Sequence, residues 1–346
     1  MRNQVDPVFP ALPCSPGTER ACFPAAVGVQ RRGFAWFLLV ILVLAWVQTG
    51  CIPNSGAAPT EDVPAGKLAS VLESGILVVA SDADYPPQSQ LNRDEPRLAD
   101  SRCGNSQYTA NQWTGFDSEV AVEIASRLGV EACFVAPTWS QIIAGNWNDR
   151  WDIHVGSMVI TPERMQNLYF TQPYVSGEAV VFVHAENQTY KNLSDLSGKR
   201  IGVCTGCAYE SYLNGTLTIP GQTIVTTIRN AVVVGYDTDT SALAELVLGD
   251  GIRLDAVMTD PDTGKAAIQG GLPIKQLDEV VYHDYSAVAL DKSTSSDSLP
   301  LARRLTEIIQ AMHADGSLLA LSQKYYQGDY TNWAASFDTE ALGQLP

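Results

Sequence analysis

The chain has 346 residues, of which 45% are hydrophobic and 17% are charged. This composition is sufficient for one large or two medium folded domains and argues against a chain that is disordered throughout. The formal net charge of −16 disfavours any partner whose phosphates must be neutralised, so we expect neither nucleic acid nor an anionic membrane surface as a ligand.

The first 50 residues have the pattern of an export signal. Arg31 and Arg32 precede an uninterrupted apolar run over 34–47. This run is too short for a comfortable membrane span, which needs roughly 20 residues, but it suits the apolar core of a signal peptide. We therefore predict a leader over 1–50, with an uncleaved anchor helix as the alternative. In both cases the remaining chain is expected outside the cytoplasm.

A lipid anchor is expected directly after the leader. Gly50 precedes Cys51 as small residues precede the acylated cysteine of bacterial lipoproteins, although Gln48 stands where leucine is usual. The following residues, up to Gly66, are rich in Pro, Ala, Ser and Gly and indicate a tether. We predict a lipid-anchored tether over 51–66, which places the protein on the outer face of the cell membrane or in the periplasm.

The folded part begins with a helical pattern over 67–74 and an apolar strand over 76–80. A polar stretch over 89–111 is expected to be a surface loop. The clearest helix follows: Asp117 can cap it, apolar residues recur at four-residue spacing from Phe116 to Leu128, and Gly129 can end it.

Strands and helices alternate through the rest of the chain. This alternation predicts parallel α/β sheets whose faces are covered by helices. Strands are expected at 133–135, 151–155, 179–183, 200–203, 255–258 and 287–290, and further helices at 241–248 and 300–314.

Arg164 has an unusual position in this pattern. Thr161 offers an N-cap and Pro162 fits the first helical position, so a helix is expected to begin here. Arg164 would then lie in the first turn, where the macrodipole disfavours a cation. An anion held between its guanidinium and the helix N–H groups would explain the arrangement. The alternative is an arginine exposed to solvent.

Several short motifs occur in a fixed order along the chain. They are Ser81-Asp82-Ala83-Asp84-Tyr85-Pro86-Pro87, Gly115-Phe116-Asp117, Ile160-Thr161-Pro162-Glu163-Arg164, Phe170-Thr171-Gln172-Pro173-Tyr174, Asp195-Leu196-Ser197-Gly198-Lys199-Arg200-Ile201-Gly202-Val203, Asp255-Ala256-Val257 and His313-Ala314-Asp315-Gly316-Ser317. Over about residues 68–330, this ordered set resembles the polar amino-acid-binding family of extracytoplasmic solute-binding proteins, which serve ABC importers.

The resemblance implies the type 2 periplasmic-binding-protein fold. This α/β fold has two lobes joined by two crossing strands, with the ligand in the cleft between them. The implied divisions are lobe 1 over 67–177 plus 284–332, lobe 2 over 178–283, a C-terminal tail over 333–346, and crossings near 174–180 and 281–286.

The resemblance also implies which residues contact the ligand. Arg164 matches the arginine that pairs with the ligand α-carboxylate, and Asp260 matches the carboxylate that receives the α-ammonium. Tyr85 and Trp139 match positions that sandwich the ligand side chain, and Asp82 matches one that meets its amine or side chain. Alternatively, Asp260 only forms a turn before Pro261 and Trp139 lies in the core. The matched set favours an amino acid with a polar or cationic side chain.

Some of the matched positions depart from the family pattern. Ser157 keeps a hydroxyl that often meets the carboxylate, whereas Val159 does not. Cys207 and Ala208 replace residues of a turn that usually supplies hydroxyl and backbone N–H donors. Cys207 therefore remains a candidate ligand contact only through its backbone N–H. Arg164 is expected to hold the ligand carboxylate with fewer additional hydrogen-bond donors than is usual in the family.

Four of the seven cysteines lie beyond the expected anchor. An even number in an exported chain permits two disulfides, and the simplest arrangement pairs Cys204 with Cys207 and Cys103 with Cys133. The sequence does not decide the connectivity. A redox role for the C-x-x-C is the alternative to a stiffened turn. No metal site is expected, because two of the cysteines are isolated and no histidine lies nearby in sequence.

The expected function is capture of an amino acid and its delivery to the membrane permease of an ABC importer by hinge closure, as a monomer without cofactor. One alternative is an enzyme, because some family members resemble dehydratases of cyclic carboxylates. The four histidines, His154, His184, His283 and His313, lie in no recognisable acid/base motif, so no catalytic residue is predicted. A sensory ligand-binding domain is the other alternative.

Overall fold

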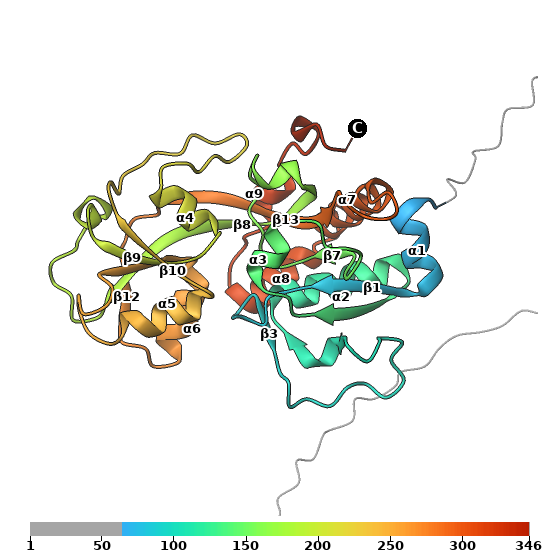
Figure 1. Cartoon of the computed structure of the whole chain (residues 1–346), viewed down its shortest axis with the longest axis horizontal. Coiled ribbons are helices and arrows are strands. Elements are labelled where there is room, and N and C mark those ends of the chain that lie inside the picture. Colours follow the sequence, from blue (N-terminus) through green and yellow to red (C-terminus); the bar gives the residue numbers. More distant parts are fainter. Residues whose placement is uncertain (1–63, 346) are drawn as a thin grey trace, which may run out of the picture. The chain divides into compact units, whose positions relative to one another are not determined.

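The computed structural model describes residues 64–345 (Figure 1). The predicted leader, the predicted anchor at Cys51 and nearly all of the predicted tether lie outside these residues. Between residues 64 and 345, no helix combines the length and the apolar character that crossing a bilayer would need.

Within the described part of the chain, ten strands form one long sheet in the order β10-β9-β11-β8-β13-β7-β1-β6-β4, with β12 paired to β8 beside this path. These strands are β1 (Ile76–Ala80), β4 (Tyr108–Thr109), β6 (Glu131–Val135), β7 (Ile153–His154), β8 (Leu168–His184), β9 (Arg200–Cys204), β10 (Val232–Tyr236), β11 (Ala256–Thr259), β12 (Ile274–Gln276) and β13 (Tyr282–Asp291). A small second sheet contains β2 (Asp84–Tyr85), β3 (Ser89–Leu91) and β5 (Trp113–Thr114).

The strands β8 and β13 connect the two halves of the long sheet. They pair antiparallel from Tyr282 opposite Ala179 to Asp291 opposite Leu168, and they lie side by side in Figure 1. β13 also pairs with β7, whereas β8 also pairs with β11 and β12. The two crossing segments implied by the resemblance are therefore one antiparallel ribbon.

Buried apolar side chains form cores on both sides of this ribbon. The cores around β1, β6 and β7 draw on residues 71–175 and on 287–318. The cores around β9 and β11 draw on residues 179–282, with Val159 added from outside that range. Parallel pairs such as β1 with β6 and β9 with β10 are covered by helices. This is the predicted two-lobed α/β architecture.

Four of the helices in the described residues lie where the apolar periodicity predicts them. The helices in the described residues are α1 (Gly66–Ser74), α2 (Phe116–Leu128), α3 (Trp139–Ile143), α4 (Ala208–Leu213), α5 (Asp239–Leu246), α6 (Pro261–Gln269), α7 (Leu299–Ala314), α8 (Ser317–Tyr326) and α9 (Asn332–Ala335). The sequence predicts α1, α2, α5 and α7. The sequence does not predict α3, α4, α6, α8 and α9, and length alone does not explain this, because the predicted α1 and α5 have only nine and eight residues.

Two predicted helix starts are wrong. Gly115, not Asp117, is the N-cap of α2, and the Asp117 side chain makes no capping bond. After Thr161 the chain forms only a three-residue 3₁₀ turn, Arg164–Gln166, although Thr161 Oγ1 does accept a hydrogen bond from the Arg164 N–H (3.3 Å). A longer helix cannot form because β8 already begins at Leu168.

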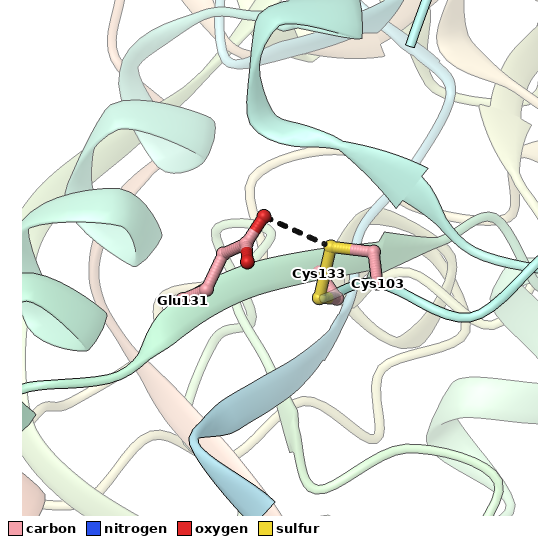
Figure 2. Close-up of side chains that lie close together, drawn as sticks. All are labelled: Cys103, Glu131 and Cys133. Atoms are coloured by element: carbon pink, nitrogen blue, oxygen red, sulfur yellow. Dashed lines mark hydrogen bonds between the residues drawn. A yellow bond between two sulfur atoms is a disulfide. The ribbon is translucent and has the colours of Figure 1, made fainter. Parts of the chain in front are cut away.

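The predicted surface loop over 89–111 is partly regular and is tied to the sheet. It contains β3 and β4, and Cys103 is bonded to Cys133 of β6, with 5.4 Å between their Cα atoms. Figure 2 shows Glu131 beside this disulfide, with a carboxylate oxygen 3.6 Å from Cys103 Sγ. The disulfide therefore holds the insertion against an interior strand.

The C-terminal residues pack along β8. Gln172 Nε2 donates to the carbonyl of Ala334 (2.7 Å), and Gln344 Nε2 donates to that of Leu168 (2.9 Å). Ser176 donates to the Tyr330 carbonyl through both its N–H (2.7 Å) and its hydroxyl (2.8 Å). The segment expected to be a tail is thus bound to the ribbon close to the crossing.

Candidate functional site

Two adjoining cavities contain the predicted ligand-binding residues. One has an empty volume of about 560 Å³, part of which is open to solvent. The other, of about 490 Å³, shares Tyr85, Ser157, Val159 and Tyr209 with it. The first cavity is lined by Asp82, Tyr85, Trp139, Ser157, Arg164 and Cys207, and the second includes Asp260.

Most of these cavity residues lie just after the carboxyl ends of parallel strands. Residues 81–85 follow β1, residues 156–159 follow β7, and the turn 205–207 follows β9. Residues 237–239 follow β10 and Asp260 follows β11. In open α/β sheets, ligands generally bind at such strand ends.

Arg164 is a buried cation that faces the larger cavity. Its side chain donates through Nη1 to the Val159 carbonyl (2.8 Å) and through Nη2 to the Gly206 carbonyl (2.9 Å). The guanidinium carbon lies 5.2 Å from the centre of the Trp139 ring. Burial lowers the arginine pKa to about 10, so the group is still charged at neutral pH.

The charge of Arg164 has no carboxylate within ion-pair distance among residues 64–345. A buried charge without such a partner is costly, and a guanidinium has five N–H donors, more than two carbonyls can use. The expected donors from a helix N-terminus are absent, because the chain forms only a short turn here. An anion would therefore be held mainly by the guanidinium.

Asp260 has the turn-forming role that the sequence left as one alternative, and its side chain also lines the second cavity. It is the N-cap of α6, where Oδ1 accepts from the N–H groups of Asp262 and Thr263 (2.9 Å each). Its carboxylate also accepts from Tyr85 Oη (2.8 Å) and Gln88 Nε2 (3.0 Å). Tyr85 and Gln88 come from the segment after β1, so these bonds join the two lobes.

Several further carboxylates line the larger cavity. They are Asp84, Asp237 and Asp239, in addition to the predicted Asp82. Burial raises the pKa of Asp82, and it raises that of Asp239 to about 8, with the charge of Asp260 raising the latter further. Asp239 therefore carries a proton at neutral pH. Neither Asp239 nor Gln88 stands out in the sequence as a cavity residue.

The hydroxyl of Ser157 serves another buried acid. Ser157 Oγ donates to Asp117 (2.9 Å to Oδ2), and Tyr174 Oη donates to Oδ1 of the same carboxyl (2.8 Å). Burial raises the pKa of Asp117 to about 7, while these two donors lower it. Ser157 has a φ of 48°, and its N–H donates to Tyr174 Oη (2.7 Å). The backbone and hydroxyl of Ser157 are thus directed toward α2 and β8.

The turn after β9 carries the second disulfide. Cys204 is bonded to Cys207, and both line the larger cavity. Between them, Gly206 has a φ of 77°, accepts from Arg164 and donates its N–H to Glu210 Oε2 (2.6 Å). The turn therefore positions the arginine through its carbonyl.

His154 is buried beside Trp139, with ring centres 5.8 Å apart. Its Nδ1 lies 3.0 Å from the Ala80 carbonyl, and burial lowers its pKa to about 4. The imidazole is therefore neutral at physiological pH, in keeping with the structural role that its strand position predicts.

The chain is similar to known bacterial binding proteins. The family model of bacterial extracellular solute-binding proteins, family 3, matches residues 103–328. The L-cystine-binding protein TcyJ of Escherichia coli (strain K12) is 28% identical over 268 residues, covering 77% of this chain and 88% of the relative. ABC transporter arginine-binding protein 1 of the same organism is 26% identical over 224 residues, covering 62% and 83%.

Solved structures agree with the fold. The ancestral amino acid-binding protein AncCDT-1, described as a precursor of cyclohexadienyl dehydratase, aligns with a TM-score of 0.60 and 26% identity. The alignment covers 76% of this chain and all of that one. Tv2483 bound to L-arginine aligns with a TM-score of 0.62 at 18% identity, which supports the fold alone.

Proposed function

Because this chain belongs to family 3 of the bacterial extracellular solute-binding proteins, we propose that it captures an amino acid outside the cytoplasm and delivers it to the permease of an ABC importer. Its relatives include proteins named for binding cystine, arginine and histidine. The observation that carries the proposal is the buried guanidinium of Arg164, which faces the larger cavity without a carboxylate partner in residues 64–345.

The proposed ligand contacts follow from the charges around the two cavities. A ligand α-carboxylate pairs with Arg164, and the α-ammonium is received by Asp260 in competition with Tyr85 and Gln88. Trp139 and Tyr85 contact the ligand side chain, which extends toward Asp82. The surplus of carboxylates repels an acidic side chain, so we propose a polar or cationic one.

Hinge closure is the proposed mechanism of capture. Arg164 lies before β8 and Asp260 lies after β11, so a ligand held by both would join the two lobes across the ribbon. A ligand that binds both lobes at once stabilises the closed state relative to the open one. The closed state is then what the permease recognises, and the protein acts as a monomer without a catalytic step.

We further propose that residues 1–50 are removed and that Cys51 is acylated, which would anchor the protein at the membrane. Fractionation of cells expressing wild type and Cys51→Ser tests this. Wild type is expected with the membranes and the variant in the soluble fraction, and equal membrane association of both would contradict the anchor.

Calorimetric titration of the purified chain with the twenty amino acids tests the main proposal. At least one polar or cationic amino acid is expected to bind. Arg164→Ala is expected to weaken that binding by about 2–5 kcal/mol, because it removes one partner of a buried charged pair. The matched control is Arg304→Ala, an exposed arginine of α7 paired with Glu307, which leaves affinity unchanged.

Two results would overturn this function. One is the absence of binding to every amino acid. The other is chemical conversion of a cyclic carboxylate by the purified chain, which would favour the dehydratase alternative. Equal losses in Arg164→Ala and Arg304→Ala would remove the specific role given to Arg164.

A further inference from the structure

A disulfide forms part of the wall of the larger cavity. Cys204 and Cys207 line it together with Arg164 and Asp239. The Cys204 side chain is buried, whereas Cys207 is partly exposed. Cys207 is therefore the more accessible of the two cavity cysteines to a small molecule in the cavity.

Asp239 lies next to both sulfur atoms. A carboxylate oxygen of Asp239 and the two Sγ atoms all lie within 4.8 Å of one another. The Asp239 side chain belongs to a residue only 5% exposed, yet its Oδ1 finds no hydrogen-bond partner within residues 64–345. A buried acid that holds its proton at neutral pH, with one oxygen unused, can donate that proton to a neighbouring sulfur.

The second disulfide offers a comparison within the same molecule. Cys103 and Cys133 are both buried, and neither lines either cavity. They too have a carboxylate nearby, that of Glu131 (Figure 2), but Glu131 accepts hydrogen bonds from Ser101 Oγ and from the Arg102 N–H (2.8 Å). The Cys204–Cys207 disulfide thus differs from the Cys103–Cys133 disulfide in two ways. It lines a cavity, and the carboxyl group beside it has an oxygen without a hydrogen-bond partner in residues 64–345.

We propose that Cys204–Cys207 is a thiol–disulfide exchange site for small thiols that carry a carboxylate. Arg164 holds the carboxylate, and its Nη2 already donates to the Gly206 carbonyl between the two cysteines, so the thiol arrives beside the disulfide. The orientation of the thiol depends on the carboxylate-binding role proposed for Arg164. The exchange reaction itself does not require that the protein transports an amino acid.

The exchange consists of two displacements. A first thiolate attacks Cys207 Sγ, the Cys204–Cys207 bond breaks, and the Cys204 thiolate takes the proton of Asp239. A second thiolate attacks the sulfur of the bound small molecule, which leaves as a small disulfide, and the Cys207 thiolate takes a proton from solvent. Two small thiols are oxidised by two electrons, and the protein disulfide is reduced to a dithiol. In reverse, the dithiol reduces a small disulfide.

The test exposes the purified full chain to excess free cysteine. Samples are quenched with acid, free thiols are alkylated, and peptide mass spectrometry follows each cysteine pair separately. Cys204 and Cys207 are expected to open at least 10-fold faster than Cys103 and Cys133. Cysteamine, which lacks the carboxylate, is expected to react at least 10-fold more slowly with the cavity pair than cysteine does.

Two variants sharpen the test. Cys204→Ser exposed to cystine is expected to accumulate a mixed disulfide on Cys207, because no neighbouring thiol remains to release it. Asp239→Asn is expected to slow the exchange by about 100-fold or more, as loss of a positioned acid does. Circular dichroism and the melting midpoint show whether each variant is folded.

The proposal is overturned if the cavity pair opens as slowly as Cys103–Cys133 in folded protein. Equal rates with cysteine and cysteamine would overturn the carboxylate requirement. Amino-acid binding with an inert Cys204–Cys207 would refute this inference alone, whereas rapid exchange without amino-acid binding would refute the proposed transport function alone.

Discussion

Three buried aspartates near the cavities hold protons that exposed carboxyls would release. Burial, the main cause in each case, raises the pKa of Asp117 and Asp284 to about 7 and that of Asp239 to about 8. Between pH 4 and these values the three carboxyls bind more protons in the folded chain than in the unfolded chain. Linkage then requires that the free energy of unfolding fall as pH rises through this interval.

Chemical denaturation at pH 5, 6, 7 and 8 tests this dependence in the ligand-free protein. Stability is expected to fall by a few kcal/mol over the range, and Asp239→Asn is expected to flatten the fall by about a third. Asp315→Asn is the matched control: Arg127 lowers the pKa of Asp315 to about 2, so its contribution is lost only below about pH 4. An unchanged slope in Asp239→Asn would contradict the assignment.

At single positions, the sequence predicts which residues line the cavities better than it predicts the groups to which those residues are hydrogen-bonded. Arg164, Asp260 and Tyr85 stand out because they occupy matched positions in ordered motifs. Gln88 and Asp239 do not stand out in the sequence. They reach the cavities only because the fold brings the ends of distant strands together. The environment of Arg164 was also unpredictable, because its carbonyl partner Gly206 lies 42 residues further along the chain.

Elements with a continuous buried face are predicted well, and short or partly exposed ones are not. The strand β1 and the helices α2 and α7 show clear apolar periods. By contrast, β10 has no buried residue. Its side chains therefore do not alternate between a buried face and a solvent face, and the sequence pattern does not reveal the strand. Missing β10 also concealed the cavity residues that follow it.

The packing of α6 on β8 depends on one glycine. A Cβ atom added at Gly264 would lie 1.8 Å from the ring of Phe182, which is fully buried. Since β8 is paired on both edges, the ring cannot move away without disturbing the ribbon or its neighbours. Gly264→Ala is therefore expected to lower the free energy of unfolding by about 1–3 kcal/mol.

Urea denaturation compares this variant with Gly104→Ala, where the added Cβ meets nothing closer than 3.6 Å. The control is expected to keep the wild-type midpoint. A wild-type midpoint for Gly264→Ala as well would mean that α6 shifts freely on β8, and the packing argument would then be wrong.

For the whole molecule, closure around the ligand is the property to measure. Small-angle X-ray scattering is expected to show a smaller radius of gyration when the bound amino acid is saturating, and no change on adding it to Arg164→Ala. At a ligand concentration 100 times Kd, wild type is also expected to gain about 2.7 kcal/mol of stability. Binding without any change in scattering would contradict hinge closure.

The largest core has a consequence for how the protein is made. It is built from residues 71–175 and 288–318, whereas the residues of the cores around β9 and β11 end by 282. During synthesis, the early strands therefore cannot complete their core until residues 288–318 have left the ribosome. Bringing these distant segments together also closes a long intervening loop, which costs conformational entropy. The chain stays incompletely folded until nearly all of it exists. Such a late-closing core would leave the chain able to cross a membrane as an extended polypeptide before it folds outside the cytoplasm.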